Sequence, residues 1–411
     1  MNLRLRGRLG APASPPQVWA TDHQSVQITW GWLEAETVTV RCGDQSITVE
    51  QAPGPGGVLF VGLDSDSGYR IDLVDDRSRS LVERPLSFRT LPRPPGELLY
   101  RVATISDMHL GSSRWGFFKT MTEACGVKVD GGPPPAIVAG EPPGPYRDLH
   151  PVRCAQSALD DAEAWGARLV VAKGDNVQHE NAECHDLFGS LVDSAPELPM
   201  MAIPGNHDLD EAGRYIPDHV GRRKLPICRD VAHLDLPGVR VVVADTSIPG
   251  RGKGTVERVG PGILDTVADA DRPVLLFTHQ QFQPGKVARH WPIGITAPES
   301  TDFLDRLDGL GTPVVISSGH THRNRVRRHG SVLLTEVGST RDWPCVWAGY
   351  NIFEGGLEQT VHRVSEQTAM AWAEYSRQAV GGLWSTWSPG TSSDRNVGLS
   401  WPNPRIGWIP T

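Results

Sequence analysis

Aspartate, asparagine and histidine residues stand at five places where an apolar run of the sequence ends. They are Asp107 with His109, Asp175, Asn206 with His207, His279, and His320 with His322. Carboxylate and amide oxygens and imidazole nitrogens suit manganese, iron and zinc alike. None of the six cysteines forms a CxxC pair, so a zinc finger is excluded. One such position could be a polar turn, but five in sequential units predict a metal site.

The spacing of these residues indicates that they face a common point. In 201–208, for example, an apolar run leads through Pro-Gly directly into Asn-His-Asp. Active sites of α/β proteins lie at the C-terminal ends of strands. In an extended segment, residues i and i+2 point to the same side. We therefore expect Asp107 and His109 to face one ion together, and likewise His320 and His322.

Strands that alternate with helices must position these residues. The expected strands that end at the polar positions are 99–105, 168–172, 200–203, 274–277 and 313–316. Helical periodicity predicts helices between them, the first at 151–166. A Gly/Pro-rich insertion at 111–150 follows the first of these strands and therefore begins beside the expected ions. Its length is unusual for a connector, so we expect it to fold over the site and select the leaving group.

The first part of the chain follows a different pattern. Short alternating runs such as 26–30 and 38–42 are separated by turn signals, without a helical period. This pattern predicts a small all-β sandwich domain over 1–95. Leu63 followed by Tyr69 resembles the tyrosine corner of fibronectin type III-like domains.

A proline-rich connector at 92–96 marks the domain boundary. We expect a catalytic domain at 96–365, and a chain that starts near Leu98 to fold without the sandwich. Residues 366–411 are expected to form a helix and a tryptophan-bearing tail packed on the catalytic domain.

Composition restricts the location and the partners. The chain has 411 residues and a net charge of −8, which argues against nucleic acid and anionic membranes as partners. No apolar run approaches the ~20 residues of a membrane span, and the N-terminus lacks a signal-peptide core. The cysteines are interpreted as scattered thiols, so we expect a cytoplasmic protein. The oligomeric state is left open.

Five motifs occur in order along residues 98–365: Asp-Met-His, Gly-Asp-Asn, Gly-Asn-His-Asp, a single histidine after an apolar strand, and Gly-His-Thr-His. In this order they resemble the calcineurin-like metallophosphoesterases. The resemblance implies an α/β fold, a two-layer sandwich of mixed β-sheets flanked by helices, with two divalent ions (Mn, Fe or Zn). It assigns one ion to Asp107, His109, Asp175 and His322. It assigns the other to Asp175, Asn206, His279 and His320. A hydroxide between the ions would attack phosphorus in line.

The resemblance also implies roles near the ions. Asn206 and His207 would bind a phosphate oxygen, and His207 would protonate the leaving alkoxide. Asp208 is predicted either to orient His207 or to serve the local structure. Arg114 could clamp a phosphate oxygen, the alternative being a solvated surface arginine.

Two positions separate this chain from purple acid phosphatases, whose domain layout it otherwise resembles. Gln178 stands where they have a tyrosine ligand, and His109 stands where they have glycine. The Asp-Met-His-Leu-Gly sequence is similar to the opening of repair nucleases and of cyclic-nucleotide phosphodiesterases, and the acidic balance of the chain weighs against DNA. The leading prediction is a phosphodiesterase acting on a small phosphoester, with cyclic nucleotides among the candidates. The alternative is a phosphomonoesterase or protein phosphatase-like enzyme. A metal-binding module without catalysis is the third reading, against which the complete ligand set argues.

Overall fold

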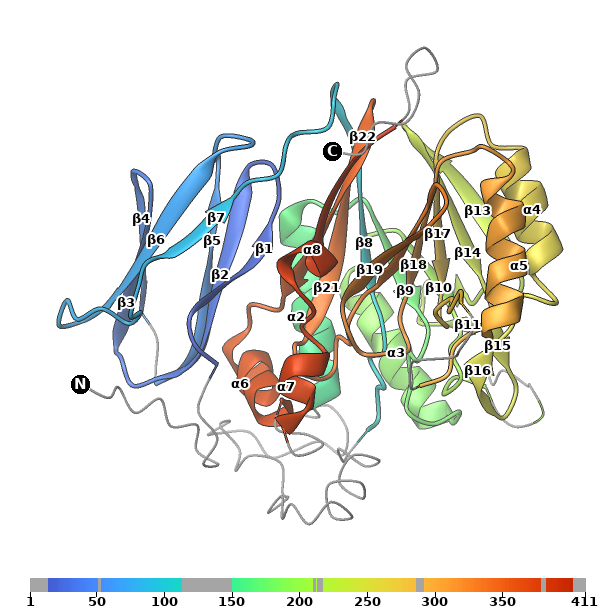
Figure 1. Ribbon diagram of the computed structural model, residues 1–411. Coiled ribbons are helices and arrows are strands. Elements are labelled where there is room, and N and C mark those ends of the chain that lie inside the picture. Colours follow the sequence, from blue (N-terminus) through green and yellow to red (C-terminus); the bar gives the residue numbers. More distant parts are fainter. Residues whose placement is uncertain are drawn as a thin grey trace.

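Two six-stranded mixed sheets lie face to face and form the larger part of the molecule (Figure 1). The structure, a computed structural model, describes residues 14–50, 53–112, 150–209, 212, 217–285, 292–377 and 382–401. The predicted fold, a sandwich of mixed sheets flanked by helices and preceded by an all-β region, is confirmed.

The first sheet carries three of the predicted strand ends. In spatial order its strands are β10 (Met200–Ile203), β9 (Leu169–Lys173), β8 (Leu98–Ile105), β21 (Val346–Phe353), β22 (Gly356–Arg363) and β23 (Asn396–Ser400). β8, β9 and β10 are parallel, so their carboxyl ends meet at one edge. β21, β22 and β23 complete the sheet in antiparallel pairs.

The second sheet carries the other two strand ends. Its strands are β13 (Val231–Leu236), β14 (Val239–Ala244), β17 (Val274–Thr278), β18 (Val314–Ser318), β20 (Val332–Glu336) and β19 (Arg325–His329). The four central strands, β14, β17, β18 and β20, are parallel and buried along their whole length. Strands covered on both faces read as continuous apolar runs, which is why these were predictable.

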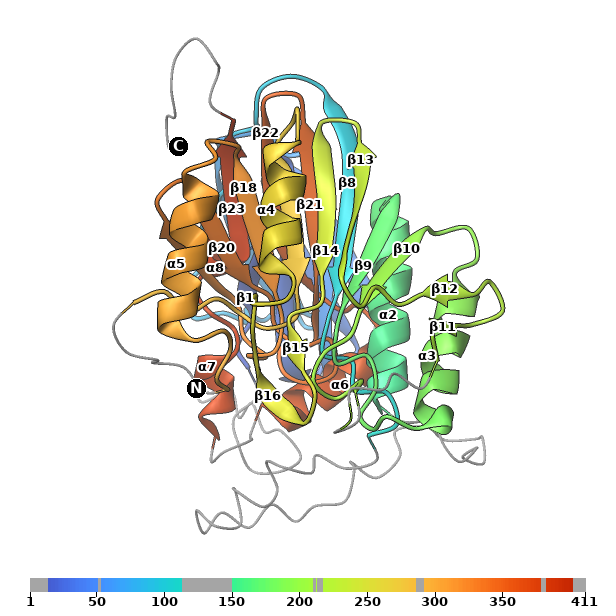
Figure 2. The ribbon, with the colours of Figure 1, turned by 90° about the vertical axis from the view of Figure 1, so that its right-hand side faces the viewer.

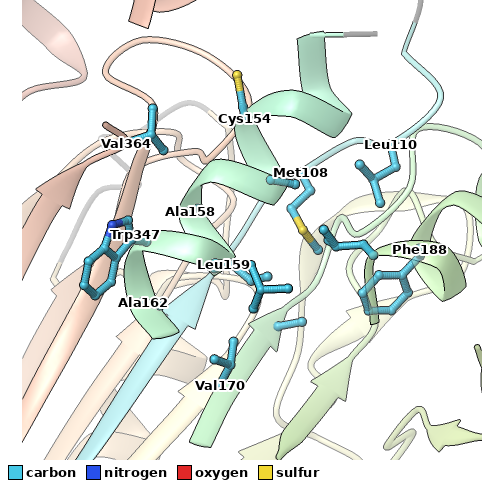
Figure 3. Packing of buried hydrophobic residues seen from close by; sticks show 14 of the residues in the cluster. Met108, Leu110, Cys154, Ala158, Leu159, Ala162, Val170, Phe188, Trp347 and Val364 are labelled. Carbon is cyan, nitrogen blue, oxygen red and sulfur yellow. The ribbon is translucent and has the colours of Figure 1, made fainter. Parts of the chain in front are cut away.

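Helices cover the outer faces of both sheets (Figure 2). α2 (His150–Trp165) and α3 (Ala182–Ser194) pack on the first sheet, and α4 (Gly260–Ala268) and α5 (Ala297–Asp308) pack on the second. α2 buries Ala155, Ala158, Leu159 and Ala162, spaced as one face of a helix requires, against β9 (Figure 3). None of the described helices has the length and apolar character needed to cross a bilayer.

The remaining elements are short. They are the ribbons β11 (His219–Val220) with β12 (Leu225–Pro226) and β15 (Ser247–Ile248) with β16 (Arg251–Gly254), and the helices α6 (Gln367–Ser376), α7 (Trp384–Trp387) and α8 (Ser392–Arg395). α6 and α7 lie at the end of the sheets where β8 ends, the lower end in Figure 1. The tail thus returns to the edge that carries the predicted ligands.

The N-terminal region is all-β, as predicted. One antiparallel sheet contains β1 (Gln17–Thr21), β2 (Ser25–Leu33) and β5 (Gly54–Val61). The other contains β4 (Gln45–Glu50), β3 (Thr37–Cys42), β6 (Gly68–Asp75) and β7 (Leu86–Arg89). The Tyr69 hydroxyl accepts a hydrogen bond from the Asp64 backbone N–H at 2.8 Å, a contact found in tyrosine corners. The fibronectin type III resemblance itself stays a prediction.

The N-terminal region is bound tightly to the rest of the chain. Trp19 is fully buried and packs edge-on against Trp343, with ring centroids 6.2 Å apart, and the guanidinium of Arg363 lies over both rings, 5.6 and 4.6 Å from the two centroids. His23 pairs with the buried Glu358 at 2.6 Å. Such buried aromatic and charged contacts weigh against the expectation that a chain starting near Leu98 folds alone.

Candidate metal centre

All seven predicted metal ligands converge at the carboxyl ends of β8, β9, β10, β17 and β18. The metal-type atoms fall into overlapping groups whose members lie within 4.8 Å of one another: Asp107, His109 and His322; Asp175, His279 and His320; and His109, Asp175 and His207. We call Asp107, His109 and His322 the first ligand group. Asn206, His279 and His320 form the second ligand group.

In the first ligand group, two imidazole nitrogens and a carboxylate oxygen face one another. His322 Nε2 lies 3.4 Å from Asp107 Oδ1 and 3.3 Å from His109 Nε2. His322 donates its Nδ1–H to Asp342 Oδ2 at 2.9 Å. This bond fixes the tautomer, so that the neutral ring presents a lone pair at Nε2, as metal-binding histidines do.

The second ligand group has the same arrangement with a backbone partner. His279 donates its Nδ1–H to the Lys173 carbonyl at 2.9 Å, and its Nε2 lies 3.3 Å from Asn206 Oδ1. His320 is buried, and its Nε2 has no hydrogen-bond partner among the described residues. A buried polar atom without a partner is unfavourable unless something else satisfies it.

Asp175 lies between the two groups and offers one oxygen to each. Its Oδ1 is 3.3 Å from His279 Nε2, and its Oδ2 is 3.6 Å from His109 Nε2. Lone pairs of carboxylate oxygens and imidazole nitrogens therefore face one another within each ligand group. A cation bound in each group would stabilise this arrangement. The donor set of oxygens and imidazole nitrogens fits a dimetal centre.

The protonation of the free residues supports this fit. Burial lowers the pKa of His279, but the Asp175 carboxylate, Asp107 and the Lys173 carbonyl together raise it to about 9. Burial also opposes the charge of His322, yet Asp342 and Asp107 raise its pKa to about 10. Without metal, protons on these two rings would balance the carboxylates, and divalent ions would replace those protons.

The backbone around the ligands is unusual. Asp107, His109, Asp175, His320 and His322 all have positive φ, between 47° and 67°. Residues 106–109 and 319–322 are outside strands, so the extended alternation that we assumed for the i, i+2 pairs is wrong. The pairs still face one site, but through left-handed conformations, which residues with a Cβ adopt rarely and aspartate and histidine adopt more often than most.

Two glycines allow neighbouring loops to approach the ligand residues closely. A Cβ on Gly205 would collide with the backbone nitrogen and Oδ1 of Asp175. A Cβ on Gly319 would collide with the Ser106 hydroxyl and Asp107 Oδ2. Any larger residue at either position would push a ligand out of place.

His207 lies at the rim of the site. Its backbone N–H donates to Asp175 Oδ1 at 2.9 Å, and its ring packs edge-on against His109 with centroids 4.7 Å apart. The Nδ1–H donates to the Gln178 carbonyl at 3.1 Å, which leaves Nε2 as the atom that can exchange a proton. The half-buried ring is accessible, unlike most of the ligands.

Asp208 is fully buried and bonds to the backbone. Its carboxylate accepts hydrogen bonds from the N–H groups of Gly205, Val177 and Asn176 at 2.7, 2.9 and 3.1 Å. It thereby joins the loop after β9 to the loop after β10. Of the two predicted roles, these contacts favour the structural one.

The sequence analysis did not identify the loop at residues 339–344, between β20 and β21. Its Ser339 hydroxyl donates to the Asp107 carbonyl at 2.9 Å, and its Asp342 holds His322. Arg341 contacts Gln178 Oε1 at 3.2 Å. The sequence does contain a signal for this loop. Polar residues follow an apolar strand and a glycine here, as they do at the predicted ligand positions. Arg114, predicted to clamp phosphate, lies outside the described residues.

Comparison with known proteins gives one family. The model described as calcineurin-like phosphoesterase matches residues 100–324. No curated protein sequence matches the chain.

Solved structures resemble the chain only distantly. A purple acid phosphatase from yellow lupin (Lupinus luteus) seeds is 12% identical, with a TM-score of 0.42, over 87% of this chain and 73% of that one. The structure of PhoD is 9% identical, with a TM-score of 0.39, over 85% and 84%. A putative 5′-nucleotidase from Staphylococcus aureus is 13% identical, with a TM-score of 0.38, over 70% and 58%.

Proposed function

This chain belongs to the calcineurin-like phosphoesterase family, and from that premise we propose that it is a dimetal-dependent phosphodiesterase acting on a small phosphoester. Cyclic nucleotides are among the candidate substrates. The observation that carries the proposal is the position of Asp175, which offers one carboxylate oxygen to each ligand group. A site of this kind is suited to phosphoryl chemistry, because two adjacent cations can stabilise both the attacking and the leaving oxygen.

The two ions would be held as the resemblance implies. Asp107, His109, Asp175 and His322 would hold one, and Asp175, Asn206, His279 and His320 would hold the other. When bound, the ions supply positive charge next to the phosphoryl oxygens and lower the pKa of water. Manganese, iron and zinc all suit these donors.

His207 is assigned as the general acid. With Nδ1–H held by the Gln178 carbonyl, the protonated ring would present Nε2–H to the leaving alkoxide and transfer that proton as the P–O bond breaks. Asn206 and His207 would also contact a phosphate oxygen. Asp208 acts indirectly, since it fixes the loop that carries Asn206 and His207.

The alternative function is a phosphomonoesterase, and the position of Arg341 favours it. Arg341 contacts Gln178, which also contacts His207, so a further positive charge lies beside the expected position of the leaving group. A monoester dianion carries one more charged oxygen than a diester. Cytoplasmic location also stays a proposal.

A substrate panel tests the function. The full chain is freed of metal by a chelator, reloaded with Mn²⁺, and assayed on bis-p-nitrophenyl phosphate, p-nitrophenyl phosphate and cyclic nucleotides. We expect metal-dependent hydrolysis, fastest on the diesters. A preference for the monoester would favour the alternative, and a metal-loaded protein inactive on every ester would contradict both.

A further inference from the structure

We propose that Arg341 binds a non-bridging oxygen of the phosphoryl group, the role that sequence reasoning had given to Arg114. This inference rests on the proposed function, since it concerns the anion that the metal site would process. Arg341 comes from the 339–344 loop, which lies outside all five predicted motifs.

Arg341 lies beside the residues expected to touch substrate. Its Nη1 is 3.2 Å from Gln178 Oε1, and the Gln178 carbonyl accepts the Nδ1–H of His207 at 3.1 Å. Its Nη2 is 3.2 Å from Asp342 Oδ2, the same oxygen that accepts the Nδ1–H of His322. The guanidinium is therefore close enough to act on the first ligand group and on the proposed acid.

The guanidinium has spare hydrogen-bonding capacity. Of its five N–H groups, those on Nη1 face Gln178 Oε1 and, at 3.5 Å, the Ser112 hydroxyl, and one on Nη2 faces Asp342 Oδ2 at 3.2 Å. Nε is buried and has no hydrogen-bond partner among the described residues. A buried N–H without an acceptor is unfavourable, and an anion at this position would satisfy it.

Arg341 is also held rigidly. Only 7% of the residue is exposed. Its carbonyl accepts a hydrogen bond from Trp372 Nε1 at 2.7 Å, and Asp342 beside it is bonded to Trp384 Nε1 at 3.3 Å. A surface arginine pays conformational entropy on binding an anion, whereas this one is already ordered. The planar fork of a fixed guanidinium matches the geometry of phosphate oxygens.

The test measures binding of inorganic phosphate to the Mn²⁺-loaded full chain by calorimetry. Arg341→Lys keeps the charge but loses the planar fork, and Arg341→Gln loses both. We expect phosphate affinity to fall about 10–100-fold in Arg341→Gln, as for the loss of a charged hydrogen bond, and less in Arg341→Lys. Metal content and the melting curve should match those of wild type.

Two control variants separate binding from structure. Arg240 is as buried, at 6% exposed, but sits at the opposite end of β14, so Arg240→Lys should leave phosphate affinity unchanged. Gln178→Ala removes the amide that Arg341 contacts. If Gln178→Ala reproduces the full loss seen in Arg341→Gln, Arg341 only holds Gln178, and the inference fails.

The remaining outcomes are distinct. Wild-type phosphate affinity in both Arg341 variants would overturn the inference and leave the proposed hydrolase intact. Loss of metal in both variants would also overturn it, since Arg341 would then act through Asp342 and His322. Arg341-dependent phosphate binding by a protein that hydrolyses no ester would refute the proposed function and support the inference.

Discussion

The two ligand groups of the metal centre are held by different parts of the chain. The second group is fixed by the sheets themselves, since His279 is oriented by the backbone carbonyl of Lys173 at the end of β9. The first group depends on a side chain from another loop, because His322 is oriented by Asp342, which Trp384 of α7 holds in turn. One group is therefore intrinsic to the core, and the other is assembled from distant segments.

This difference makes the two ions separable in principle. Partners that orient a ligand from behind change metal affinity about 10–100-fold when removed. For the first group such a partner is a side chain and can be mutated, whereas for the second it is backbone and cannot. We therefore expect the ion held by the first ligand group to be lost before the other, both on mutation of its surroundings and on dilution of the metal.

The largest effect is expected where the two groups meet. Asp175→Asn should weaken both ions and lower kcat at least about 10³-fold, because several kcal/mol of charge stabilisation would be lost. Metal analysis and turnover are the measurements, with Asp193→Asn, outside the site, as control. A variant with two ions and near-normal kcat would show that Asp175 is no bridge.

The second-largest effect is expected at His207, where the rate of hydrolysis should fall although both ions stay bound. His207→Ala should retain both ions and lose about 10²–10⁴-fold in rate on esters with poor leaving groups. The loss should shrink with p-nitrophenolate, which leaves without a proton. Should the variant release metal instead, His207 would be a ligand and not the acid.

The comparison between the groups is tested by the partner of His322. Asp342→Asn should weaken one ion about 10–100-fold and leave the other bound, as a metal titration would show in two separate steps. Glu358→Gln is a matched control, since Glu358 also binds a histidine Nδ1 but lies away from the site. Equal weakening of both ions would mean that the two groups are not independent.

The smallest effect is expected one contact further away. Trp384→Phe removes the N–H that binds Asp342 and should weaken the same ion about two- to tenfold, the contribution of one hydrogen bond. Trp387→Phe serves as control, because Trp387 lies in the same helix and stacks on Arg323 instead. An effect as large as that of Asp342→Asn would indicate that the tail does more than orient one carboxylate.

Sequence patterns were sufficient to pick out the residues of both ligand groups and many of the sheet strands. The strands β17 and β18 were predicted to within two residues, because burial on both faces leaves a continuous apolar run. β16 was missed because Arg251–Gly254 has no apolar alternation, and β23 because it is a short edge strand. Neither carries enough buried side chains to leave a pattern.

Patterns failed where a role depends on a partner far away in the chain. Arg323 begins a basic stretch of the sequence, yet it is buried and pairs with Glu336 at 2.9 Å. Asp342 and Arg341 were overlooked for the same reason, since only contacts with His322, Gln178 and the tail reveal them. The order of the motifs identifies the candidate ligands. The residues that orient those ligands can be recognised only from the three-dimensional structure.

The position of α6 and α7 has a consequence for biosynthesis. Trp372 and Trp384 bind the 339–344 loop, and both follow every metal ligand in the chain. During translation, the second ligand group can therefore assemble while the first still lacks its support. The nascent chain would therefore hold the ion of the first ligand group at its full affinity only after α7 had left the ribosome.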